Sequence, residues 1–75
     1  MEKALVLIKL KHKYSRNLLS QLKNIVGVAD ADFIFGPSDA YATIETESKE
    51  NLWNIVTKIR NVYGVHNTLT CNAVA

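Results

Sequence analysis

Cysteine, proline and glycine are scarce in this sequence, and the shortage of cysteine excludes whole classes of protein. The 75 residues include one cysteine, one proline and three glycines. Because Cys71 has no partner in the chain, an intramolecular disulfide and a cysteine-based metal site are both excluded. Lys9 and Lys11 interrupt the apolar stretch near the N-terminus, and Glu2 precedes it. We therefore expect no signal peptide or membrane span, and a cytoplasmic location.

Net charge is also low. Nine Lys and Arg residues against seven Asp and Glu residues leave a charge of +2, which argues against a polyanion as the main partner. His12 and His66 lack the spacing of metal ligands, so neither a metal nor another cofactor is predicted. Hydrophobic residues make up 48% of the chain, enough for residues 1–75 to fold as a single domain.

The hydrophobic pattern predicts four strands and two helices. Residues 4–10, 28–35, 40–47 and 65–74 are expected to form strands. Residues 16–26 and 49–62 have helical spacing, with Ser15 and Ser48 as N-caps. The expected buried stripes are Leu18, Leu19, Leu22, Ile25 and Val26 in the first helix, and Leu52, Ile55, Val56, Ile59 and Val62 in the second.

The two halves of the chain repeat one pattern: "RNLLSQLKNI" precedes Gly27-Val28, and "ENLWNIVTKI" precedes Gly64-Val65. This doubled unit predicts an α+β, ferredoxin-like βαββαβ fold, with both helices on one face of a four-stranded antiparallel sheet. The first strand is apolar on both faces, because Ala4, Val6, Ile8 and Leu10 share one face and Leu5 and Leu7 lie on the other. We therefore expect a second copy to cover the open face, giving a dimeric α/β sandwich or barrel.

Catalytic and nucleic-acid-binding residues are hard to find in the sequence. No nucleophile and base share a short motif, and Cys71, in an alternating strand, is expected to be a small core residue. One RNA-binding module with this fold order stacks bases on strand aromatics. Here the corresponding strand offers Tyr41 but also Glu45 and Glu47, which repel phosphate.

The tetrapeptide Gly36-Pro37-Ser38-Asp39 separates two predicted strands. Its simplest interpretation is a β-turn with Pro37 at the second position. The alternative is a ligand site, because a carboxylate beside glycine backbone can bind an ammonium group while free amides bind a carboxylate. Those two groups are the ends of an α-amino acid.

From about Ala4 to Val74 the chain resembles the effector-binding (RAM) domain of the Lrp/AsnC family of regulators. The matching pieces are the Gly27-Val28 exit with Ala29 and Asp30, the Gly-x-x-Asp of "GPSDAY", the helix "ENLWNIVTKIRNVYGV", and the Thr-x-Thr of "NTLT". The resemblance implies a homodimer, assembled further into a higher homo-oligomer, with a small amino-acid effector at an interface between subunits. The ligand-binding residues it implies are Gly36, Asp39, Ala40, Tyr41, Thr68, Leu69 and Thr70.

Family members carry an N-terminal DNA-binding helix-turn-helix, and this sequence starts at its first strand. We therefore expect a stand-alone, non-enzymatic effector domain without direct DNA binding, one that acts alone or with full-length relatives. Two alternatives stay open. The chain could be a small dimeric enzyme of the monooxygenase or isomerase type that uses His12, His66 or Tyr41, or a plain oligomerisation module. A pocket within one subunit that encloses a histidine would favour the enzyme, and a pocket between subunits beside Asp39 would favour the regulator.

Overall fold

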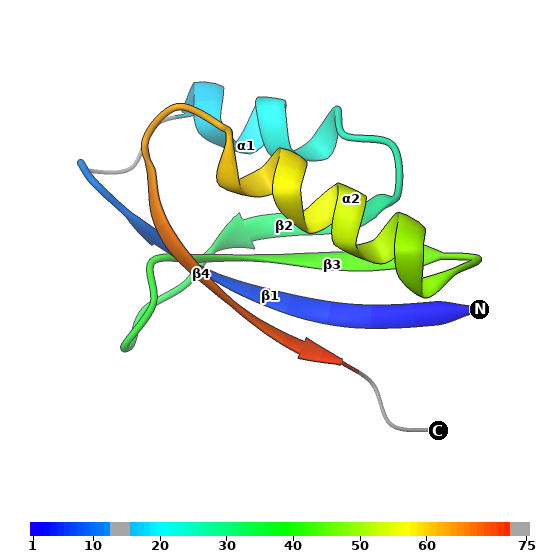
Figure 1. The fold of residues 1–75 in the computed structure, drawn as a ribbon. Helices are drawn as coiled ribbons and strands as arrows, with labels where there is room; N and C mark the ends of the chain where they lie inside the picture. Colours follow the sequence, from blue (N-terminus) through cyan, green and yellow to red (C-terminus); the bar gives the residue numbers. More distant parts are fainter. Residues whose placement is uncertain (13–15, 73–75) are drawn as a thin grey trace.

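The computed structural model describes residues 1–12 and 16–72 (Figure 1). Its elements follow the predicted order: β1 (Glu2–Leu10), α1 (Arg16–Lys23), β2 (Val28–Phe33), β3 (Ala40–Thr46), α2 (Lys49–Arg60) and β4 (Val65–Asn72). The predicted N-cap Ser15 and the end of the last predicted strand lie outside the described residues. Neither helix in the described ranges is long and apolar enough to cross a membrane.

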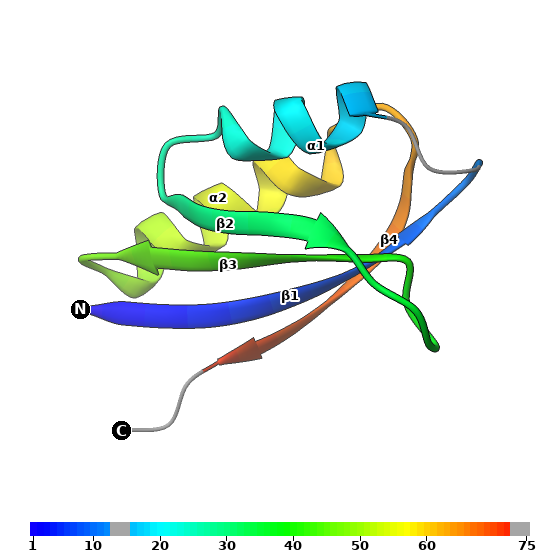
Figure 2. The same ribbon diagram turned by 180° about the vertical axis from the view of Figure 1, so that it is seen from behind.

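The four strands form one antiparallel sheet in the order β2-β3-β1-β4. Both helices lie against the same face of this sheet, and the other face is uncovered (Figures 1 and 2). The ferredoxin-like α+β fold predicted from the sequence is thereby confirmed.

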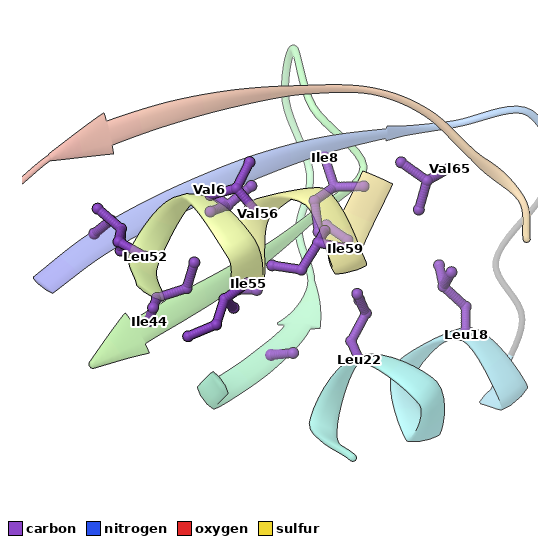
Figure 3. Close-up of a cluster of buried hydrophobic side chains, with 14 residues drawn as sticks. Val6, Ile8, Leu18, Leu22, Ile44, Leu52, Ile55, Val56, Ile59 and Val65 are labelled. Atoms are coloured by element: carbon purple, nitrogen blue, oxygen red, sulfur yellow. The ribbon is translucent and has the colours of Figure 1, made fainter. Parts of the chain in front are cut away.

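The core lies between the sheet and the helices (Figure 3). Alternate residues of β1 point into it: Val6 and Ile8 are fully buried, and Ala4 is nearly so. Four residues of the stripe predicted for α2 are buried as expected: Leu52, Ile55, Val56 and Ile59. The fifth, Val62, is only partly buried and lies beyond the helix, because α2 ends at Arg60 instead of residue 62. Ser48 is its N-cap as predicted, because its Oγ accepts a hydrogen bond of 3.1 Å from the Asn51 backbone N–H.

The first helix ends earlier than predicted. It stops at Lys23, and the Ile25 N–H then donates to the Leu22 carbonyl, three residues back. Gly27 follows with φ of +101°, which takes the chain out of helical geometry. Val26, predicted to be buried, is therefore 86% exposed.

The uncovered face of the sheet carries apolar side chains from two neighbouring strands. Leu7 of β1 pairs with Leu69 of β4, and Leu5 pairs with Cys71. Leu69 is 63% exposed and Leu5 is 38% exposed. The prediction that Cys71 is a core residue is wrong for the single chain, because Cys71 is exposed on this face.

Candidate functional site

The candidate site begins at the connection between β2 and β3, which extends beyond the sheet on the side away from the helices (Figures 1 and 2). The connection is closed by the Ile34 N–H, which donates to the Asp39 carbonyl at 3.0 Å. Gly36 has φ of +136°, a conformation that L side chains rarely adopt. The β-turn predicted for residues 36–39 is not closed by the Asp39 N–H. That N–H donates instead to the Ile8 carbonyl of β1, at 2.9 Å.

The Asp39 carboxylate has a structural partner. Its Oδ2 accepts a hydrogen bond of 2.9 Å from the Leu10 backbone N–H, at the last residue of β1. Asp39 therefore extends the pairing of β1 and β3 through both its amide and its side chain. Among the described residues no donor reaches the other oxygen, Oδ1.

The remaining predicted ligand residues lie on two faces of the sheet. Thr68 and Ala40 both pair with the buried Ile8, and Thr70 pairs with Val6, on the helix-covered side. Ala40 is fully buried, so its side chain cannot touch a ligand in this structure.

Thr68 is also engaged, because its Oγ1 accepts a hydrogen bond of 3.1 Å from Arg60 Nε of α2. Tyr41 and Leu69 both pair with Leu7 and face the opposite way, onto the open face. The seven predicted residues therefore do not converge on one pocket within a single copy.

Tyr41 belongs to an acidic corner of the open face. Its hydroxyl donates to Asp30 Oδ2 at 2.9 Å. This hydrogen bond, desolvation, and the charges of Asp30 and Asp32 raise the pKa of Tyr41 above its ordinary value. Tyr41 thus acts as a neutral hydrogen-bond donor, already paired, in an electronegative setting that does not suit a nucleic acid phosphate.

A pocket of about 240 Å³ lies between α1, the end of β1 and the start of β4. Its described lining consists of Leu10, His12, Asn17, Leu18, Gln21, Tyr63 and Gly64. In the sequence, only His12 of this group is a candidate functional residue, whereas Leu18 is assigned to the core and Gly64 to the exit of the second helix. This pocket and Asp39 lie at the same end of the sheet, because the Leu10 N–H binds the Asp39 carboxylate.

A second hollow, of about 400 Å³, lies over β1, β3 and β4, where its lining includes Leu5, Thr43 and Cys71. Its lining also includes the charged residues Lys3 and Glu45. Within the described part of the chain, no three His, Cys, Asp or Glu side chains are grouped as metal ligands. His66, on β4, is exposed.

No protein-family model and no curated protein matches this sequence. Solved structures do match, over almost the whole chain. FFRP-DM1 is 25% identical with a TM-score of 0.89, covering 99% of this chain and 100% of its own. TTHA0845 from Thermus thermophilus is 29% identical with a TM-score of 0.91, covering 100% of this chain and 95% of its own.

Two longer proteins share the fold. AsnC of E. coli is 20% identical with a TM-score of 0.89, and 99% of this chain matches 51% of AsnC. The feast or famine regulatory protein of M. tuberculosis, in complex with L-methionine, is 17% identical with a TM-score of 0.83, and all of this chain matches 51% of that protein. This chain thus has the fold found in regulators of the Lrp/AsnC, or feast/famine, type.

Proposed function

We propose that this chain is an amino-acid-binding regulatory domain of the Lrp/AsnC type, which modulates transcription when an amino acid binds at an interface between subunits. The observation that carries the proposal is the match of the whole chain to regulators of this type, one of which is complexed with L-methionine. Two of the matched structures are covered over 95% or more of their own length, which supports a stand-alone form of the domain.

The proposed ligand group is Asp39. Its free Oδ1 is suited to an ammonium group, while Oδ2 stays on the Leu10 N–H. The Gly36 and Ser38 backbone amides are the proposed partners of the ligand carboxylate, since Pro37 has no N–H. The other proposed contacts are with Ala40, through its backbone, and with Tyr41, Thr68, Leu69 and Thr70. A neighbouring subunit completes the site, because these residues do not converge within one copy.

The proposed assembly begins with a homodimer formed through the open face of the sheet. Leu5, Leu7 and Leu69 form an apolar stripe there, which a second copy would remove from water. Dimers would then join into a higher oligomer. An amino acid that binds across an interface stabilises the assembly containing that interface, and this linkage is the proposed mechanism.

The proposed setting is the cytoplasm, and the proposed route to DNA is indirect. The acidic corner formed by Asp30, Asp32 and the paired Tyr41 is unsuited to phosphate. Co-assembly with full-length relatives that carry a DNA-binding domain would bring this chain to a promoter.

One observation bears on the enzyme alternative, because the 240 Å³ pocket lies within one chain and includes His12. A catalytic histidine is usually oriented by a carboxylate or works beside a nucleophile. The described lining of this pocket contains neither a carboxylate, a thiol nor a second imidazole. The matched structures with informative names are regulators. We therefore favour the regulatory function.

The test is a thermal-shift screen of the common L-amino acids on the wild type, Asp39→Asn and Asp39→Ala. The asparagine variant keeps a side-chain oxygen for the Leu10 N–H but removes the negative charge. The alanine variant removes both. We expect one or a few amino acids to raise the melting temperature of the wild type, and neither variant to respond.

Comparison of the two variants without ligand separates a binding defect from a folding defect. Asp39→Ala is expected to lose about 1–2 kcal/mol of stability, because it leaves the partly buried Leu10 N–H without its acceptor. Asp39→Asn should melt close to the wild type. A ligand response in Asp39→Asn equal to that of the wild type would remove Asp39 from the site. No response of the wild type to any amino acid at millimolar concentration would contradict the proposed function.

A further inference from the structure

Phe35 is the most exposed of the large hydrophobic side chains in the described part of the chain. It is 97% exposed, in the connection between β2 and β3. Phenylalanine is usually buried, because removing its large apolar surface from water is favourable. The neighbouring Gly36 adopts a positive φ, and Pro37 has a fixed φ. Phe35 thus contacts almost nothing within its own chain, and a contact with another molecule could bury it.

The same chain has a pocket of suitable size for an aromatic ring. A cavity of about 150 Å³ lined by aliphatic side chains can hold benzene, and the pocket between α1 and β4 measures about 240 Å³. Leu10 and Leu18 supply apolar lining, and Tyr63, which is 85% exposed, stands at the rim. An entering ring would contact both leucines and cover Tyr63.

The segments of the chain that carry the loop and the pocket differ in charge. Residues 24–48 contain five acidic residues and no lysine or arginine, and Asp32 and Asp39 flank the Phe35 connection. Residues 3–29 contain six lysines and arginines and no acidic residue. That basic segment contributes Leu10, His12 and Leu18 to the pocket, and Lys11 lies beside it, because the Lys11 N–H donates to the carbonyl of Gly64, a lining residue. Asp32 beside the loop of one copy and Lys11 beside the pocket of another carry opposite charges, which favours their approach.

We propose that Phe35 of one copy inserts into the pocket lined by Leu10, Leu18 and Tyr63 of a second copy. The contact joins two different surfaces, so each copy offers one loop and one pocket, and the contact can repeat around a closed ring of copies. It brings a second subunit to the loop that ends in Asp39. It does not require an amino acid to bind, so it can hold even where the proposed function fails.

The test uses two variants that each remove one half of the contact. Phe35→Ala removes the inserted ring and keeps the pocket. Gln21→Trp places an indole from the exposed face of α1 into the pocket and keeps Phe35. Sedimentation velocity compares the wild type, each variant alone, and an equimolar mixture. Val26→Ala is the matched control, since Val26 is an 86% exposed apolar residue that belongs neither to the β2–β3 connection nor to the pocket lining.

We expect the wild type and Val26→Ala to form species larger than those of either variant alone. The mixture should recover association, because Phe35 of the Gln21→Trp chain can enter the intact pocket of the Phe35→Ala chain. Association of the wild type should also weaken as salt is raised. The proposal is overturned if Phe35→Ala sediments like the wild type, or if two folded variants show no recovery when mixed.

A second measurement does not depend on the folding of Gln21→Trp. A photoreactive benzophenone analogue of phenylalanine at position 35 should cross-link between copies, with adducts on residues 10–21 or 63–64. Adducts confined to the open face of the sheet, or no cross-linked dimer at all, would overturn the proposal.

Discussion

Gly27→Ala is expected to be strongly destabilising, because Gly27 lies under the second helix. A Cβ added at this position would come within 2.3 Å of Ile55 Cδ1 and 3.2 Å of Ile55 Cγ1. Gly27 also has φ of +101°. Gly64, at the equivalent place in the second half of the chain, has φ of +97° but nothing within 4 Å of an added Cβ. Gly64→Ala is therefore the control for backbone strain alone.

The expected magnitudes follow from these contacts. Placing alanine in the left-handed region costs about 1–2 kcal/mol, and both variants carry this cost. Forcing a methyl group against Ile55 in a packed core adds roughly 1–3 kcal/mol for Gly27→Ala. We therefore expect Gly27→Ala to lose about 3 kcal/mol and Gly64→Ala about 1.5 kcal/mol. In a domain of this size, 1 kcal/mol lowers the melting temperature by roughly 4–8 °C.

The assay is urea unfolding of both variants, with Ile55→Val added to each. Valine lacks Cδ1, the atom nearest to the added Cβ. Ile55→Val alone should cost about 1 kcal/mol, yet it should cost less, or even stabilise, in the Gly27→Ala background. In the Gly64→Ala background its cost should be unchanged. Equal losses for the two glycine variants, or additivity within about 0.5 kcal/mol in the Gly27→Ala double variant, would refute the predicted clash.

Three further predictions concern the open face, the second helix and Tyr41. Leu69→Asp should dissociate the proposed dimer in sedimentation experiments, whereas Val26→Asp, which changes an exposed residue away from that face, should not. Ser48→Ala should lose about 1 kcal/mol in urea unfolding, because the Asn51 N–H loses its cap. Asp30→Asn should lower the pKa of Tyr41 towards its ordinary value in a spectrophotometric titration. Because the pKa of Tyr41 is raised in the folded state, its contribution to stability is complete at neutral pH and is lost at alkaline pH, as Tyr41 ionises.

Periodicity predicted the elements well, because apolar residues at helical or alternating spacing must share a face to form one core. Periodicity did not predict where the first helix ends. Val26 fits the spacing of the first helix, but the helix stops at Lys23, before the left-handed Gly27. The alternating side-chain pattern of a strand also does not show which of its two faces the helices cover. Cys71 therefore lies with Leu5 on the open face instead of in the core.

The candidate site was only partly visible in the sequence. The Gly-x-x-Asp pattern located the connection between β2 and β3, but the bond from the Leu10 N–H to Asp39 joins residues 29 positions apart. Such a contact depends on strand register, which a single sequence does not state. The strand pairing also places Leu69 and Thr68 on opposite faces, although the sequence grouped them in one site. Phe35 belongs to none of the motifs, Tyr63 had no functional role assigned from the sequence, and only the exposure of these two side chains in the structure marks them.

The most direct test of amino-acid-linked assembly is a sedimentation-velocity titration of the wild type with the amino acids that raise its melting temperature. We expect a binding amino acid to shift the wild type towards a larger assembly, and we expect no such shift in Asp39→Asn, which should fold as stably as the wild type. A size distribution that stays the same at saturating amino acid, or an equal shift in Asp39→Asn, would contradict amino-acid-linked assembly.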